Sequence, residues 1–285
     1  MTDTPGEFEA YVDGIVRPDD EARAEGARLA AEAGSGGGRL GELAAWLAAV
    51  QGRAPAGAPH RARLVVIGDR PAGRSASLAE AFGVEVMVSD RRTEPEPDVM
   101  AEVQAGAGLA DAAVDAGVDL LLLALPDPAL VVPSAALVGL LTRSDAAEVT
   151  ATGQPDADWM VAAAQTRDAM RRGRGLLADQ AAMLRAVGGP GLAAAVGLLL
   201  QAAVRRTPVV LDGPVSAAAA LVAARIAFRA PLWWLAGSLS PDPAHALALE
   251  RLSLDPVLDL GLRGDDGTGA LLAVPLLRAA VTPVA

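Results

Sequence analysis

Short apolar runs alternate with longer segments of helical period through most of the chain. The runs hold roughly five residues each and are rich in Val, Ile and Leu, which is typical of strands buried on both faces of a sheet. They predict strands at 63–69, 84–88, 119–125, 207–213 and 231–237. Helices are predicted around them, at 19–33, 40–50, 77–82, 100–116, 133–141, 158–172, 179–187, 191–205, 215–227 and 245–252.

This alternation predicts an α/β fold, with a Rossmann-like, mostly parallel sheet and helices on both of its faces. We also expect a small helical subdomain formed by the N- and C-terminal segments. The chain would then divide into N-terminal helices at 1–58, an α/β core at 59–250, and an acidic Gly-rich loop with a C-terminal helix at 251–285. In folds of this kind, ligands bind beyond the carboxyl ends of the strands.

Aspartates follow two of the predicted strands. Asp69 comes at the end of the first strand, and Asp212 and Gly213 come at the end of the fourth. Because carboxyl ends of parallel strands meet at one edge, these three residues are candidate ligand contacts. The alternative is ordinary turn chemistry, since Asp often bonds to the backbone of the turn it starts.

Composition excludes several kinds of chemistry. The chain has 285 residues, 52% of them hydrophobic, which is enough for a large buried core. Its net charge of −11 argues against nucleic acid as a partner, although a small anion can still bind locally. The sequence contains no Cys and no Lys, so thiolate, Schiff-base and Walker A lysine chemistry are excluded. With only two His, far apart in the chain, we expect no metal and no cofactor.

The sequence also carries no sign of export or membrane insertion. Its first residues are acidic and lack the basic and apolar regions of a secretory signal. The longest apolar run, 192–204, is shorter than the roughly 20 residues that a membrane-spanning helix needs. We therefore expect a cytoplasmic protein without a membrane partner.

The segment 258–270 carries the strongest candidate chemistry. Its sequence, L-D-L-G-L-R-G-D-D-G-T-G-A, places Asp265 and Asp266 before a Gly-Thr-Gly turn (Gly267, Thr268 and Gly269) that leads into an apolar helix. Such a turn can hold a carboxylate beside free backbone N–H groups, which suits base chemistry on an anionic ligand. The alternative is a solvated acidic turn in which Thr268 is the helix N-cap.

Other notable residues have structural explanations. His245 falls near a helix start, where a structural role is favoured over acid–base or metal chemistry. His60 lies in a Pro-flanked linker and is expected to be exposed. Trp233 and Trp234 lie in an apolar strand, so core or interface packing is favoured over base stacking.

Several motifs in this order and spacing resemble those of the nicotinate-nucleotide:dimethylbenzimidazole phosphoribosyltransferase family of cobalamin biosynthesis. They are L-R-A-V-G-G at 184–189, T-P-V-V-L-D-G at 207–213, A-A-A-L-V-A-A-R at 218–225, P-A-H-A-L-A-L-E at 243–250, and D-P-V-L-D-L-G-L-R at 255–263 running into G-T-G-A-L-L-A-V-P-L-L-R-A-A. The resemblance implies a homodimeric, Rossmann-like enzyme that moves phosphoribosyl from nicotinate mononucleotide to a benzimidazole. It also implies that Asp266 stands where the family has a glutamate acting as the general base.

The same resemblance shows where this chain departs from the family. The family's glycine-rich phosphate motif falls on A-L-P-D-P-A-L-V-V at 124–132, where prolines lack an N–H and an Asp repels anions. A Gly-Arg-Gly-Thr-Gly motif falls on 150–154, which keeps Gly153 as a candidate contact but has lost the Arg. A His-Arg pair falls on Ser238 and Leu239, and the family segment after Gly-Asp-His-Gly is missing near Asp69.

These departures remove ligand contacts while the packing motifs persist. We therefore predict a homologue of the family whose phosphoribosyl transfer is weakened or lost. The alternative is a non-catalytic protein of the same fold that binds a ligand or pairs with a related enzyme. The expected partners are nicotinate mononucleotide or a benzimidazole-like small molecule, and a second copy in a homodimer or a related enzyme.

Overall fold

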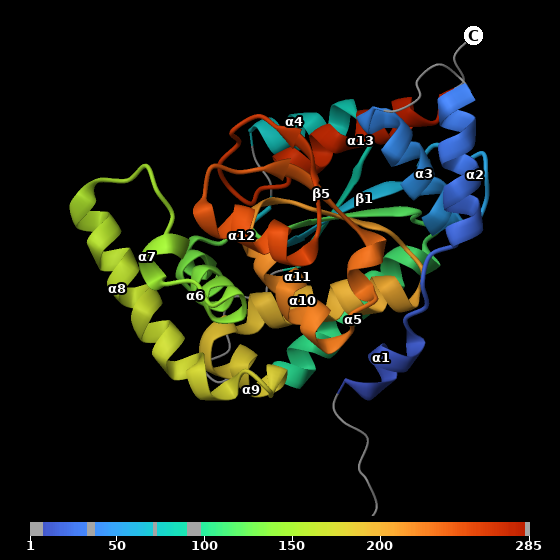
Figure 1. Cartoon of the computed structure of the whole chain (residues 1–285). Coiled ribbons are helices and arrows are strands. Elements are labelled where there is room, and N and C mark those ends of the chain that lie inside the picture. The colour runs from blue at the N-terminus through green and yellow to red at the C-terminus, as the bar shows by residue number, and fades with distance from the viewer. Residues whose placement is uncertain (1–7, 33–37, 71–72, 90–97, 283–285) are drawn as a thin grey trace, which may run out of the picture.

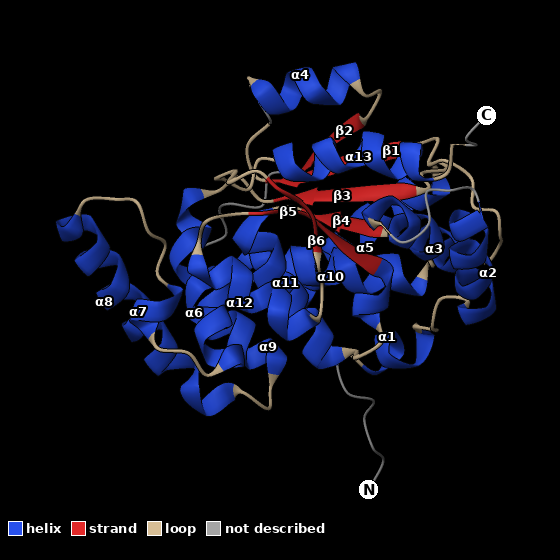
Figure 2. Ribbon diagram, turned by 45° about the horizontal axis from the view of Figure 1, so that its top comes forward, coloured by secondary structure: helices blue, strands red, loops and turns tan. Residues whose placement is uncertain are grey.

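A six-stranded, fully parallel sheet forms the centre of the protein (Figure 2). The computed structural model describes residues 8–32, 38–70, 73–89 and 98–282. The strand order is β2-β1-β3-β4-β5-β6. The strands are β1 (Ala62–Ile67), β2 (Glu85–Ser89), β3 (Leu120–Ala124), β4 (Val209–Leu211), β5 (Trp234–Leu239) and β6 (Pro256–Asp259).

Helices account for most of the remaining described residues. They are α1 (Glu9–Gly14), α2 (Asp20–Ala30), α3 (Arg39–Gln51), α4 (Arg74–Ala81), α5 (Val99–Asp115), α6 (Val131–Thr142), α7 (Ala146–Val149), α8 (Asp156–Gly173), α9 (Gln180–Met183), α10 (Pro190–Val204), α11 (Gly213–Ile226), α12 (Pro243–Leu252) and α13 (Thr268–Ala280). Among the described residues, no helix has the length and apolar character needed to cross a membrane.

The helices cover both faces of the sheet, which confirms the predicted fold class. In Figure 2, α13 and α4 lie on one face, and α5, α10 and α11 lie on the other. The hairpin of α2 and α3 packs against α13, so N- and C-terminal segments lie side by side (Figure 1). Helices α6 to α8 form one end of the molecule (Figure 1). The division at residues 58 and 250 stays a prediction.

The core follows from the apolar runs. All five residues of β3 are fully buried, as expected for a central strand with helices on both faces. Against the sheet, α10 is buried along almost its whole length, which explains why its sequence is apolar on every side. Burial on this scale fixes the positions of the strand ends, where the candidate site lies.

Local differences from the predicted elements have physical reasons. The strand predicted at 231–237 begins only at Trp234, because Pro231 starts a short 3₁₀ turn over Ala230–Trp233. Strand β6 was not predicted; it is a four-residue edge strand whose first residue is proline, a residue that edges tolerate. The Gly-rich turn between α2 and α3 falls mainly on residues outside the described ranges.

Candidate active site

The acidic loop lies at the carboxyl edge of the sheet. It joins β6 to α13, and a recess beside it is lined also by residues that follow β4 and β5. Five of the sequence-predicted site residues line this recess: Asp212, Gly213, Asp266, Thr268 and Gly269. The structure therefore brings the end of the fourth predicted strand and the acidic loop into one place.

Two aspartates exchange helix caps across this edge. Asp212 precedes α11, but its carboxylate accepts hydrogen bonds from the N–H groups of Gly267 (2.8 Å) and Ala270 (3.0 Å) at the start of α13. Asp265 precedes α13, but its Oδ1 accepts a hydrogen bond from the N–H of Val215 (2.8 Å) at the start of α11. A helix N-terminus attracts anions, and both of these are occupied by carboxylates of the chain itself.

The glycines of the loop allow this close approach. Gly267 has a φ of +91°, and a Cβ there would lie 2.9 Å from the Leu64 side chain. A Cβ on Gly269 would lie 2.6 Å from Asp212 Oδ1 and 2.8 Å from Ser238 Cβ. The Gly-Thr-Gly sequence is therefore required for seating α13 on the sheet, whether or not a ligand binds.

Asp266 occupies the position predicted for a general base. Its side chain is half-buried, and Oδ1 accepts a hydrogen bond from the backbone N–H of Thr268 (3.0 Å). The expectation that Thr268 would be the N-cap is wrong: Gly267 holds the N-cap position and makes no side-chain cap. The carboxylate of Asp212 supplies the cap instead, because it reaches the N–H groups from the neighbouring strand.

Burial changes the acidity of the two capping aspartates. It raises the pKa of Asp212 to about 7; the N–H bonds from Gly267 and Ala270 oppose this rise, and the charge of Asp266 adds to it. Burial also raises the pKa of Asp265 well above its ordinary value. A carboxyl group with a pKa of about 7, as Asp212 has, takes up and releases protons near neutral pH, which is the property that general acid–base chemistry needs.

The recess itself is very small. Its cavity volume is about 10 Å³, which is at the lower limit for a single water molecule. Ligand pockets in proteins usually measure about 300–1,000 Å³. As the described residues line it, the recess beside Asp266 is smaller than a nucleotide or a benzimidazole.

The segment 124–132 contains a third helix start at which a backbone N–H donates to an Asp side chain. Asp127 follows β3, and its Oδ1 accepts a hydrogen bond from the N–H of Ala129 (2.9 Å) in the short helix Pro128–Leu130 that leads into α6. Prolines stand on either side of Asp127 and contribute no N–H groups. Where an anion would need donors, this segment presents a carboxylate.

Three predicted contact residues do not line the recess: Gly267, Asp69 and Gly153. Asp69 is exposed at the end of β1 and does not line it. Gly153, with a φ of +85°, lies against the guanidinium of Arg263, because a Cβ there would be 2.9 Å from Arg263 Nη2. Arg263 belongs to the recess, so Gly153 is its indirect neighbour.

Arg263 is a site residue that the sequence reasoning did not single out. Its Nη1 donates to the carbonyl oxygen of Thr152 (3.0 Å) and to Asp242 Oδ1 (3.2 Å). It thereby ties the 150–154 segment and the start of α12 to the acidic loop. Its position between two glycines in the loop was the available signal.

Ser240 and His245 form a buried pair beneath the recess. The N–H of Ser240 donates to His245 Nδ1 (3.1 Å), and the Ser240 Oγ lies 3.1 Å from the same nitrogen. Burial lowers the pKa of His245 to about 4. At neutral pH the ring is uncharged and Nδ1 accepts, in agreement with the structural role favoured from the sequence.

This pair predicts a pH dependence of stability. A neutral buried histidine stabilises the fold above its ordinary pKa of about 6.5, and that contribution is lost as the pH falls toward 4. Between pH 7.5 and pH 5 the loss is about 2 kcal/mol. His245→Asn keeps an acceptor for the Ser240 N–H without titrating, so the stability gap between wild type and variant is expected to shrink by that amount in urea unfolding.

Wild type must be compared with His245→Asn because Asp212 changes the pH dependence of the unfolding free energy in the opposite direction. Its pKa is raised in the folded state, so its contribution is present at low pH and is lost as the pH rises through about 7. Both proteins contain Asp212, and the difference between them isolates His245. A gap that stays constant from pH 7.5 to pH 5 would contradict a neutral, buried His245.

Comparison with known proteins places the chain in a class of phosphoribosyltransferases. A family model described as "Phosphoribosyltransferase" matches residues 93–285. Two solved structures from Thermus thermophilus have similar folds. One, a nicotinate-nucleotide–dimethylbenzimidazole phosphoribosyltransferase, has a TM-score of 0.75 at 27% identity, and covers 92% of this chain and 95% of that one. The other has a TM-score of 0.74 at 26% identity, and covers 96% and 94%.

Sequence relatives carry the same name. A nicotinate-nucleotide–dimethylbenzimidazole phosphoribosyltransferase of Streptomyces avermitilis is 41% identical, over 94% of this chain and 86% of the relative. One from Mycobacterium marinum is 39% identical, over 86% of this chain and 83% of the relative. The chain belongs to the nicotinate-nucleotide–dimethylbenzimidazole phosphoribosyltransferase family, as its motifs predicted.

Proposed function

We propose that this chain keeps the fold of its family while its phosphoribosyl transfer is strongly weakened or lost. The observation that carries the proposal is the state of the carboxyl edge. Three helix starts there donate backbone N–H hydrogen bonds to carboxyl groups of the chain itself, those of Asp127, Asp212 and Asp265. A phosphoribosyl substrate brings a phosphate, and a phosphate at any of these N-termini would have to displace a carboxylate.

The position of Asp266 supports the same proposal. Its carboxylate is one methylene shorter than glutamate and already accepts the Thr268 N–H. The recess in front of it has a volume of about 10 Å³. Displacing a reacting group by about 1 Å can lower a rate roughly a hundredfold, so the shorter acid alone would weaken catalysis, and the closed recess adds to this loss.

The alignment with the Streptomyces relative is consistent with missing ligand contacts. It extends over 324 positions, which is more than the 285 residues of this chain. The relative therefore has internal residues without a counterpart here. Loss of such segments is expected to fall on loops, where ligand contacts concentrate, and not on the sheet.

Binding of the neutral acceptor base tests the proposal. We expect titration calorimetry with 5,6-dimethylbenzimidazole to give no saturable heat, because the recess cannot admit the ring. The Streptomyces avermitilis relative, measured in parallel, is the positive control. Saturable binding that Asp266→Ala weakens would show that an open site exists beside Asp266.

We also propose that the chain forms a homodimer. Two of the exposed large hydrophobic residues lie in the N-terminal part and outside any pocket described here: Val12 (39% exposed) and Leu40 (39%). Apolar side chains of this kind are often covered by a partner surface. Sedimentation equilibrium is expected to give the dimer mass, and a monomer at micromolar concentration would exclude this assembly.

A further inference from the structure

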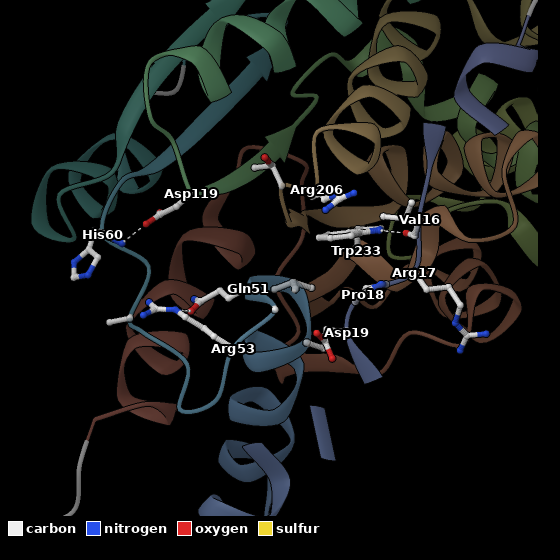
Figure 3. Close-up of a pocket in the computed structure, with 15 residues that line it drawn as sticks. Val16, Arg17, Pro18, Asp19, Gln51, Arg53, His60, Asp119, Arg206 and Trp233 are labelled. Atoms are coloured by element: carbon white, nitrogen blue, oxygen red, sulfur yellow. Dashed lines mark hydrogen bonds between the residues drawn. The ribbon is translucent and has the colours of Figure 1, made fainter. Parts of the chain in front are cut away.

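A large pocket lies at the opposite edge of the sheet from the candidate active site. Its volume is about 720 Å³, within the usual range of ligand pockets. It opens beside the amino ends of the strands, between the segment that leads into α2, the end of α3, and the residues that precede β3, β4 and β5. Figure 3 shows its walls, with Arg206 and Trp233 on one side and His60, Asp119 and Arg53 on the other.

The acidic groups of this pocket are already bound to the backbone. Asp119 accepts a hydrogen bond from the His60 N–H (2.8 Å) on one oxygen and from the Arg61 N–H (3.0 Å) on the other. Asp19 accepts one from the Ala22 N–H (2.8 Å), which caps α2. These two carboxylates therefore stabilise the local backbone, and we do not expect them to bind a cation.

Two of the three guanidinium groups in the pocket are in the opposite situation; the third, that of Arg17, lies 3.7 Å from the Asp20 carboxylate. Within the described part of the chain, the side chain of Arg206 makes no hydrogen bond or ion pair. The only partner of the Arg53 guanidinium there is the neutral amide oxygen of Gln51 (3.2 Å). In a chain whose net charge is −11, two arginines without a carboxylate line one pocket, so its free binding capacity is for an anion.

Arg206 also holds a backbone conformation that disfavours it. Its φ is +55°, and it follows α10 in a tight turn: its N–H donates to Ala203 (3.1 Å), and the Thr207 N–H donates to Ala202 (2.8 Å). Glycine is the usual residue at this place in such a turn, and a side chain there is strained. Glycine at this position would therefore keep the turn while removing the guanidinium.

The remaining wall is mixed: His60 and Thr207 contribute polar groups, and one part of it is apolar. Val16, Pro18 and Val50 line the pocket together with the ring of Trp233. The indole N–H of Trp233 donates to the carbonyl oxygen of Val16 (2.9 Å), so the indole offers the pocket no free donor. A ligand that fits both kinds of wall combines an anionic group with an apolar or aromatic body.

We propose that this pocket is a second binding site, selective for a small aromatic anion such as an aryl phosphate, with Arg206 holding the anionic group. The site lies at the amino edge of the sheet and shares no lining residue with the recess beside Asp266. It is therefore a different place in the fold from the candidate site of phosphoribosyl transfer. Neither ribose nor pyridine is required of its ligand.

Because Arg206 has a left-handed backbone, it can be replaced by glycine without destabilising the fold. A loss of binding in that variant would then not be caused by unfolding. Arg206→Gly removes the guanidinium and relieves the left-handed backbone, so the variant is expected to melt roughly 2 °C higher than wild type. Arg143→Gly is the matched control. Arg143 also has a left-handed φ, +66°, at the end of another helix, α6, and it does not line this pocket. Both variants lose one positive charge.

The probe is phenyl phosphate, measured by titration calorimetry. We expect saturable binding to wild type and to Arg143→Gly, with affinities equal within about twofold, and at least about tenfold weaker binding to Arg206→Gly. Phenol and inorganic phosphate are each expected to bind at least about tenfold more weakly than phenyl phosphate. No binding by wild type, or equal binding by Arg206→Gly, would overturn the site. Inorganic phosphate binding as tightly as phenyl phosphate would overturn the aromatic specificity.

Discussion

Replacing Gly106 by alanine is expected to destabilise the protein by at least about 3 kcal/mol. Gly106 lies where α5 crosses α10, and a Cβ there would overlap the backbone carbonyl of Ala194. The contact is reciprocal, because a Cβ on Gly197 of α10 would overlap the carbonyl of Val103 on α5. In each case the obstacle is helix backbone, so no side-chain rotation relieves it and the two helices must separate.

Gly108 is the matched control for this prediction. It lies on the same helix but is exposed, and a Cβ there meets no atom within 4 Å. Gly108→Ala is expected to stabilise the protein by about 0.5–1 kcal/mol, because alanine favours the helix interior. Urea unfolding of the two variants therefore gives opposite signs. A Gly106→Ala protein as stable as wild type would mean that α5 and α10 do not pack this closely.

The sheet and its flanking helices were predictable because burial dictates both. The run at 119–125 is apolar at every position after Asp119, and this is what a central parallel strand needs. An element with few buried residues lacks this apolar pattern, and one such element was not predicted. Strand β6 lies at the edge with only Val257 buried, so its sequence carries little of the signal that reveals buried strands.

The candidate site was predictable as a place but not as a set of contacts. Asp212 stands immediately before α11, and Asp265 stands three residues before the start of α13. In the structure each caps the other's helix, and the exchange depends on how far apart α11 and α13 start in space. Sequence spacing contains no such distance. The link from Arg263 to Thr152 is likewise a contact between segments far apart in the chain.

The second large effect concerns catalysis. The family reaction needs a phosphate held by N–H donors, a base near the acceptor nitrogen, and room for both substrates. Here Asp127 and two prolines stand at the position of the family's phosphate motif, and the recess at Asp266 measures about 10 Å³. Losing positioning and charge stabilisation together is expected to lower the rate by at least about 10⁴-fold relative to an active family member.

Restoring the family's base is expected to recover little of this rate. Asp266→Glu lengthens the acid by one methylene but changes neither the carboxylates at the helix starts nor the size of the recess. We expect its nicotinate release to stay within about tenfold of wild type. Recovery to the rate of an active relative would show that the length of the base is the only defect.

The most direct measurement is nicotinate release from nicotinate mononucleotide in the presence of 5,6-dimethylbenzimidazole, followed by chromatography. The Streptomyces avermitilis relative and Asp266→Ala are measured beside the wild-type protein. We expect rapid release by the relative, with wild type and Asp266→Ala alike at the level of the uncatalysed reaction. Release by wild type at a rate near that of the relative, abolished in Asp266→Ala, would contradict the loss of phosphoribosyl transfer.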